Sequence, residues 1–294
     1  MSELESFATY LELRESDEEG RVAAGLSHTS EGLVLFHVLE VAARGEPRGI
    51  VAIVHDAGDH GGRYEGLAGA LAEEGWAVAL PDLRGHGKTE GERGHSAGRE
   101  EVVRDLDEVF QHLAYRLVGA SKTLVGIGRG ALHGLALCAD RPGLVDRLVL
   151  VAPELTPRQT LPQGKKGLLG KMLSRVGPRS EGSLGRVAQA MTADADAARA
   201  WAGDELVHDV VSLRAGEEYQ RLTAEADSLL RSSGLPTLVL LGGEDSIGAQ
   251  AWPAVEGVDG AEVRVYAAGQ HDLFHDVVGE EVVRELCEWL AATG

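Results

Sequence analysis

Short apolar runs that alternate with helical segments constrain the fold of this chain more than any other feature. Seven runs rich in Val, Ile, Leu and Ala have strand length: Gly32–Val41, Gly49–His55, Trp76–Leu80, Lys122–Ile127, Arg147–Ala152, Pro236–Gly242 and Ala261–Ala267. Helical patterns lie between them at Tyr64–Glu74, Arg99–Val118 and Arg129–Arg141. Continuous apolar strands separated by helices are typical of a mostly parallel sheet that is buried on both faces. We therefore expect an α/β fold with helices on both sides of a central sheet.

One segment of this alternation has the layout of a nucleophile turn. Residues 123–127 read as an apolar strand, and a helix rich in small residues follows from 129. Gly126 and Gly130 frame the turn, as in the G-x-S-x-G pattern of α/β-hydrolases, in which the central serine attacks an acyl group. The central residue here is Gly128. The frame is present, but the hydroxyl nucleophile is missing.

The alternation breaks from Glu154 to about Ser228, where prolines and scattered glycines surround helical patterns at Leu184–Met191 and Ala193–Ala202. An insertion of this size late in a parallel sheet is expected to cover the strand ends, where open α/β sheets bind ligands. We expect an acidic N-terminal extension at 1–30, a core at 31–153 and 229–294, and a helical cap at 154–228.

Residues 155–180 of this insertion carry six basic and no acidic side chains. Leucine, methionine and valine residues interleave with them at roughly helical spacing. Two interpretations stay open. The segment could bind an anionic membrane surface or a lipid headgroup, or it could be a solvated cap helix whose apolar side rests on the core.

Composition excludes several classes of protein. The net charge of −19 disfavours nucleic acid as a partner, because a duplex would repel such a surface. Only Cys138 and Cys287 occur, so neither a disulfide scaffold nor a structural zinc site is expected. The acidic N-terminus does not read as a signal peptide, and we expect a cytoplasmic protein. The turn at 126–130 is too short for a phosphate-binding loop, and no cofactor is implied.

Several motifs resemble those of monoacylglycerol lipases and related lysophospholipases, which are α/β-hydrolases. The segment His55–Tyr64 resembles the H-G-x-G-x-H-x-x-R-Y loop of that family. Further matches are a D-x-R-G-H-G loop from Asp82, an acid-bearing turn at 242–245, a histidine loop at 269–272 and a cap motif at 204–208. The resemblance runs from about residue 32 to the C-terminus, in order and at plausible spacing.

This resemblance implies an α/β-hydrolase fold with a lid and a Ser-His-Asp type of site. Asp245 takes the place of the acid, and His271, 26 residues later, takes that of the base. By position, the backbone N–H groups of Ala57 and Arg129 are the oxyanion donors. Asp245 could instead cap the turn that follows it. The lone histidines His60, His86 and His95 are expected to make local loop hydrogen bonds, and no metal site is expected.

Three further residues depart from the family pattern around Gly128. Asp56 stands where the family has a glycine beside the oxyanion hole, and its carboxylate would oppose developing negative charge. Ile127 and Ala131 replace a histidine and a glycine next to the nucleophile. Together the departures indicate a sequence that has moved away from serine hydrolysis.

Three functional hypotheses follow. The chain is expected to bind an acyl or other small apolar ligand under its cap without conventional serine esterase activity. One alternative is a carboxylic-ester hydrolase of lipids whose nucleophile has been altered. Another is an enzyme that uses the pair formed by His271 and Asp245 as a general base without a covalent intermediate.

Overall fold

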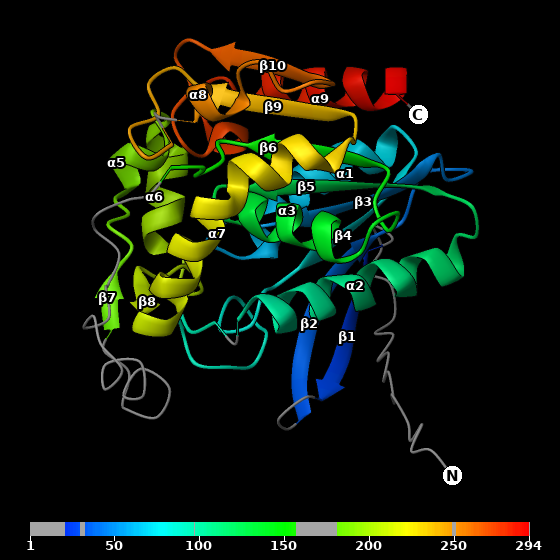
Figure 1. Cartoon of the computed structure of the whole chain (residues 1–294), viewed down its shortest axis with the longest axis horizontal. Helices are drawn as coiled ribbons and strands as arrows, with labels where there is room; N and C mark the ends of the chain where they lie inside the picture. Colours follow the sequence, from blue (N-terminus) through cyan, green and yellow to red (C-terminus); the bar gives the residue numbers. More distant parts are fainter. Residues whose placement is uncertain (1–20, 30–32, 97, 157–180, 249–250, 294) are drawn as a thin grey trace.

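The computed structural model describes residues 21–29, 33–96, 98–156, 181–248 and 251–293. An eight-stranded sheet runs through its centre (Figure 1), in the order β1-β2-β4-β3-β5-β6-β9-β10. The strands are β1 (Arg21–Thr29), β2 (Leu33–Val41), β3 (Gly49–Val54), β4 (Trp76–Pro81), β5 (Ser121–Ile127), β6 (Arg147–Val151), β9 (Thr237–Gly242) and β10 (Ala261–Tyr266). β2 is antiparallel to both β1 and β4, and all other pairs are parallel. The expected α/β fold with a mostly parallel sheet is confirmed.

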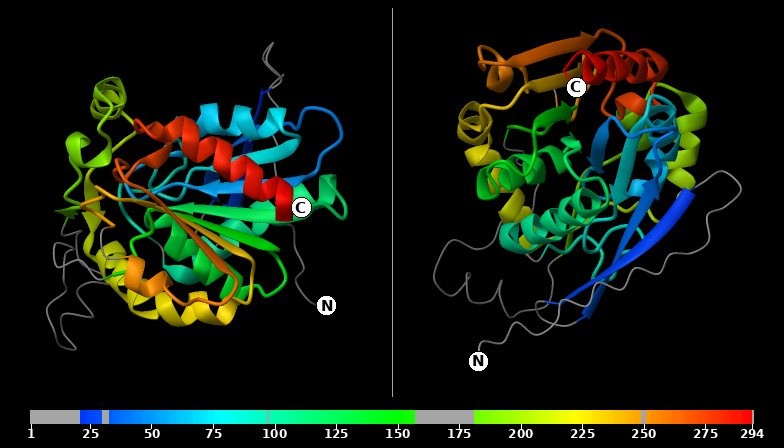
Figure 2. Two further views of the ribbon diagram at one scale, coloured as in Figure 1. Left: turned by 90° about the horizontal axis from the view of Figure 1, so that it is seen from above. Right: turned by 90° about the vertical axis from the view of Figure 1, so that its right-hand side faces the viewer.

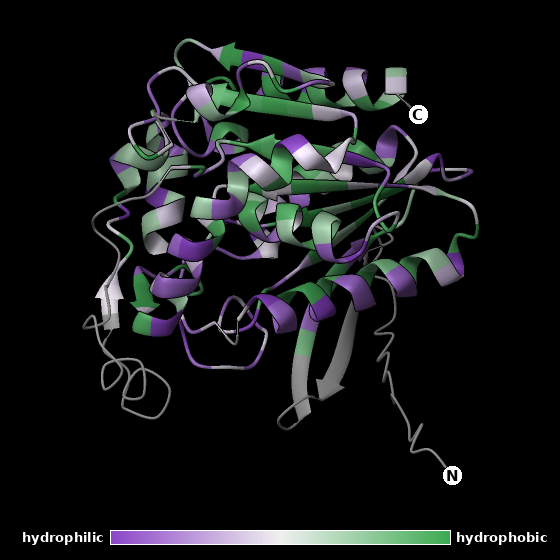
Figure 3. Cartoon of the chain, in the orientation of Figure 1, coloured by the Kyte–Doolittle hydropathy of each residue, from purple (hydrophilic) through white to green (hydrophobic). Residues whose placement is uncertain are grey.

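Helices cover both faces of the sheet because its strands are apolar on both sides. Along β3, Ile50 and Ala52 belong to one hydrophobic core, whereas Val51 and Ile53 belong to another on the opposite face. The first core is covered by α2 (Arg99–Arg116), α3 (Gly130–Asp140) and α7 (Leu213–Ser233). The second is covered by α1 (Glu65–Glu73) and α9 (Gly279–Thr293). Figure 2 shows this layering from two further sides, and Figure 3 shows apolar strands inside and polar residues along the exposed side of α2.

Between β6 and β9 the chain leaves the sheet and builds a separate layer beside the strand ends. This layer contains a small antiparallel pair, β7 (Glu181–Ser183) with β8 (Val210–Ser212), and the short helices α5 (Ala188–Met191) and α6 (Ala195–Gly203). A backbone hydrogen bond from His208 to the carbonyl of Gly58 ties the layer to the core. Most of the basic segment at 155–180 lies outside the described residues. No helix in the described ranges combines the length and apolar character that crossing a bilayer requires.

Three elements differ from the expectations. β1 pairs with β2, whereas its residues are expected to belong to an extension at 1–30. The sequence does not predict this strand because its alanine and glycine residues give a weak strand signal. The helix expected at Leu184–Met191 begins only at Ala188. The long helix α7 was missed, and the expected cap boundary at 228 falls inside it. Its buried residues recur at three- and four-residue spacing, so the pattern was present in the sequence: Ala215, Tyr219, Leu222, Ala226 and Leu230.

The glycines that frame the turn after β5 are required by close packing. A Cβ on Gly126 would lie 2.6 Å from the Cα of Ala131, and one on Gly130 would lie 2.3 Å from the carbonyl oxygen of Val54. Neither contact involves a flexible side chain that could move away. The turn therefore brings the start of α3 against the ends of β3 and β5, which positions the site described below.

Replacement of Gly130 by Ala should therefore destabilise the protein by about 3 kcal/mol, because the backbone must shift to relieve the overlap with Val54. The matched control is Gly69→Ala in α1, where a Cβ meets nothing within 4 Å. That change should stabilise by about 0.5–1 kcal/mol, since Ala loses less conformational entropy than Gly in a helix. Urea unfolding measures both free energies; equal effects of the two substitutions would contradict this account of the turn.

Candidate active site

Gly128 lies at the tip of the turn, and the space beside it is filled by another residue. Its backbone has φ +54°, and its N–H donates to the carbonyl of Val151 at 2.9 Å. A Cβ on Gly128 would lie 2.3 Å from Cγ of Asp56 and 2.4 Å from its Oδ1. The carboxylate of Asp56 thus occupies the volume into which a side chain at 128 would project. A side chain at 128 and the carboxylate of Asp56 in this position would therefore exclude each other.

The same carboxylate occupies the backbone donors assigned to the oxyanion hole. Oδ1 of Asp56 accepts hydrogen bonds from the N–H of Ala57 at 2.7 Å and the N–H of Arg129 at 2.8 Å. These donors come from the loop after β3 and from the start of α3, as the sequence predicts. In a hydrolase they would bind the negative oxygen of a tetrahedral intermediate. Here they bind a permanent negative charge of the protein.

His271 and Asp245 are brought together on the other side of Asp56. Nδ1 of His271 lies 2.9 Å from Oδ2 of Asp245, and its Nε2 lies 3.3 Å from Oδ2 of Asp56. The other oxygen of Asp245 accepts from the N–H groups of Ile247 and Gly248, at 2.7 and 2.9 Å. One oxygen of Asp245 therefore caps the turn, and the other contacts the imidazole.

Two residues that the sequence analysis did not assign complete the site. Arg186, from the layer beside the strand ends, places Nη2 2.5 Å from Oδ2 of Asp56 and also forms a short ion pair with Glu154. Its Nη1 lies 3.4 Å from Nε2 of His271. Arg129 contributes its side chain as well as its N–H, since Nη2 lies 3.2 Å from Oε2 of Glu154. The guanidinium of Arg129 also stacks on the ring of Tyr219, 4.9 Å from its centroid.

One signal in the sequence could have revealed Glu154, and none pointed to Arg186. Glu154 follows the buried strand β6 by three residues, at the edge where the carboxyl ends of parallel strands meet. A charged residue at that place is a candidate for the site. Arg186 lies in the segment expected to be helical at Leu184–Met191, but it precedes the helix that forms there, and only the fold shows that it reaches the core.

We refer to Asp56, Arg129, Glu154, Arg186, Asp245 and His271 as the buried charge network. All six residues are at most 6% exposed, so water screens their charges little. With His271 protonated, three positive charges balance three negative ones. Buried ions are tolerated when each is paired in this way, and removal of one partner leaves an uncompensated charge.

The pKa values in the network follow from this balance. Burial opposes ionisation of Asp56, but the charges of Arg186, His271 and Arg129 outweigh it and hold its pKa well below the usual range. Burial likewise lowers the pKa of His271, whereas the charge of Asp245 and the hydrogen bonds to Asp245 and Asp56 raise it, with a net value of about 9. This shift favours the protonated imidazole at neutral pH, a form in which both ring nitrogens donate to carboxylates.

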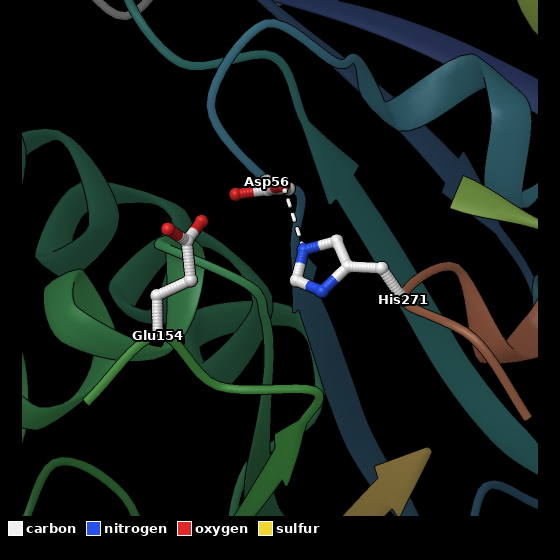
Figure 4. A group of neighbouring side chains, drawn as sticks. All are labelled: Asp56, Glu154 and His271. Carbon is white, nitrogen blue, oxygen red and sulfur yellow. Dashed lines mark hydrogen bonds and ion pairs between the residues drawn. The ribbon is translucent and has the colours of Figure 1, made fainter. Parts of the chain in front are cut away.

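Asp56, Glu154 and His271 are the one group of side chains in the described residues with ligand atoms close enough to hold a metal ion (Figure 4), all within 4.8 Å of one another. The guanidinium of Arg186 contacts all three. A divalent cation at this place would have to displace Arg186 and would still face the charge of Arg129. The residues present do not fit a resident metal.

The remaining residues singled out by the sequence lie around the network. Ile127 and Ala131 are buried on opposite faces of the sheet, each within a hydrophobic core. Three histidines make loop hydrogen bonds: His60 to Asp204 at 2.9 Å, His86 to the carbonyl of Arg84 at 3.0 Å, and His95 to Ser212 at 3.1 Å. The bonds of His60 and His95 join the core to the layer that carries Arg186.

The raised pKa of His271 predicts how stability depends on pH. A folded-state pKa of about 9, above the ordinary 6.5, gives stabilisation that is complete below pH 6.5 and is lost as pH rises through 9. The free energy of unfolding should fall over this range by at most about 3 kcal/mol, and His271→Gln should flatten the fall. His86→Gln is the control, because burial and the nearby His55 hold the pKa of His86 well below 6.5. Urea unfolding at pH 6.5 and 9.5 measures the slope; an unchanged slope in His271→Gln would refute this assignment.

Comparisons with known proteins agree with the geometry of the fold. Residues 45–277 match the family described as "Serine aminopeptidase, S33". The chain is 25% identical over 255 residues to a monoglyceride lipase homolog of monkeypox virus, covering 83% of this chain and 90% of that protein. It is also 25% identical to the monoglyceride lipase of Rattus norvegicus, with 84% of each covered. The crystal structure of Paleococcus ferrophilus monoacylglycerol lipase superposes with a TM-score of 0.77 at 27% identity, over 88% of this chain and 99% of that one. The chain therefore belongs to the serine aminopeptidase S33 family of α/β-hydrolases and is similar to monoglyceride lipases.

Proposed function

We propose that this chain is a non-hydrolytic member of its family, which binds an acyl ligand beneath its cap without serine esterase activity. The observation that carries the proposal is the position of Asp56, whose carboxylate fills the space of the nucleophile and both backbone donors of the oxyanion hole. A carbonyl oxygen cannot use donors that a carboxylate already holds. The acyl character of the ligand rests on the similarity to monoglyceride lipases.

The protonation state of His271 supports the same proposal. In acyl transfer the histidine must first take a proton from the nucleophile. Here Gly128 offers no proton, and the imidazole is held as a cation between Asp245 and Asp56. This state also counts against the alternative in which the pair activates water as a general base at neutral pH.

A simple change of the nucleophile does not explain the site. A serine at 128 would place its Cβ 2.3 Å from Cγ of Asp56, so the carboxylate would have to leave before the serine could take its place. Arg186 and Glu154 would then lose one partner of their network. The rearrangement extends over several residues and is not confined to position 128.

Esterase assays on designed variants test this proposal. We expect no turnover of p-nitrophenyl butyrate or of a monoacylglycerol by the unmodified chain beyond that of His271→Ala. Gly128→Ser alone should remain inactive, because Asp56 still fills the oxyanion hole. The double variant Gly128→Ser/Asp56→Gly should gain at least about 100-fold over Gly128→Ser, since a serine, a base and two free N–H donors are then present.

The matched control is Gly128→Ser/Asp59→Gly. Asp59 is another buried carboxylate of the same loop, but it pairs with Arg63 and Tyr64, away from the oxyanion donors. This variant should stay inactive. Turnover by the unmodified chain that His271→Ala abolishes would contradict the proposal and favour chemistry by the pair of His271 and Asp245. Full activity of Gly128→Ser alone would show that only the serine was missing.

A further inference from the structure

Four donors from four separate parts of the chain converge on the carboxylate of Asp56. Its Oδ1 is held by the N–H groups of Ala57 and Arg129, at 2.7 and 2.8 Å. Its Oδ2 lies 2.5 Å from Nη2 of Arg186 and 3.3 Å from Nε2 of His271. Each oxygen is thus bound by two donors. The two donors to Oδ2 belong to cations. We call these four donors the donor shell of Asp56; they supply a full set of hydrogen bonds to a carboxylate anion.

Two further N–H groups of the arginines in this network are buried without a hydrogen-bond acceptor among the described residues. Nη1 of Arg129 and Nε of Arg186 are buried and find no acceptor among the residues that the structure describes. Both side chains are at most 2% exposed. Unpartnered buried donors are costly, so each is a place where an additional acceptor would bind favourably.

Charge decides which class of ligand the shell can accept. The network is neutral only when one anion lies between Arg186 and the imidazolium of His271. A neutral ester in the place of Asp56 would leave these cations uncompensated in a buried site, at a large cost. A ligand carboxylate would carry the same charge and the same pair of acceptor oxygens as Asp56.

We propose that these four donors form a binding site for the carboxylate of a monocarboxylic acid, in which Asp56 is an internal occupant that competes with the ligand. The inference rests on the proposed function, since it identifies the acyl ligand as an acid instead of an ester. Asp56 is attached next to one of its own donors, so its effective concentration in the site is high. A ligand must therefore overcome this competitor, and removal of Asp56 should reveal the full affinity of the site.

The variant Asp56→Gly tests the proposal, with formate, acetate and decanoate as probes. Titration calorimetry and thermal unfolding should show that Asp56→Gly binds carboxylates at least tenfold more tightly than the unmodified chain does. Acetamide, which matches acetate in shape but carries no charge, should not bind, and neither should the neutral ester methyl acetate. Tighter binding of decanoate than of acetate would identify a fatty acid, and equal binding would identify a small acid. Asp59→Gly is the control and should show no gain.

Equal carboxylate affinities of Asp56→Gly and the unmodified chain would overturn the proposal, as would equal binding of acetamide and acetate. If Asp56→Gly does not fold alone, its refolding yield is measured against formate concentration. A saturable increase supports the site, and a yield independent of formate contradicts it. These outcomes are separate from the esterase assays, because a chain without hydrolytic activity can still fail to bind carboxylates.

Discussion

The interaction on which the rest of the site depends is the pairing of the Asp56 carboxylate with two backbone N–H groups and with Arg186. A carboxylate that is 2% exposed persists as an anion only if its lone pairs and its charge are met locally. The absent side chain at Gly128 provides the room, and the loop after β3 and the turn after β5 provide one N–H donor each. Glu154 and Arg129 then balance Arg186, so each member of the network requires the others.

The same network connects the layer beside the strand ends to the core. Arg186 follows β7, and its own N–H donates to Asp209 at 2.9 Å, which fixes the loop from which it reaches inwards. Hydrogen bonds of His60 and His95 to Asp204 and Ser212 join the two parts elsewhere. An arrangement that opens the site must separate Arg186 from two buried carboxylates. The contact between this layer and the core therefore depends on charge as well as on packing.

The sequence predicts what depends on local pattern. Apolar runs locate seven of the strands, and the framing glycines locate the turn, because both signals lie within a few residues. The order of the motifs predicts that Asp245 and His271 lie close together. For Asp56 the sequence predicts only a charge that opposes the oxyanion. That its carboxylate fills the space beside Gly128 follows only from the three-dimensional structure. Arg186 and Glu154 lie 130 and 98 residues from Asp56 in sequence, and no local pattern joins them.

We propose that the carboxylate of Asp56 takes the place of both the nucleophile and the oxyanion. A high-resolution crystal structure of the unmodified chain at neutral pH tests this most directly. We expect electron density for both oxygens of Asp56, with Oδ1 within hydrogen-bonding distance of the N–H groups of Ala57 and Arg129 and Oδ2 against Arg186. Density that shows Asp56 turned away from these donors, with water bound to the two N–H groups, would contradict the account.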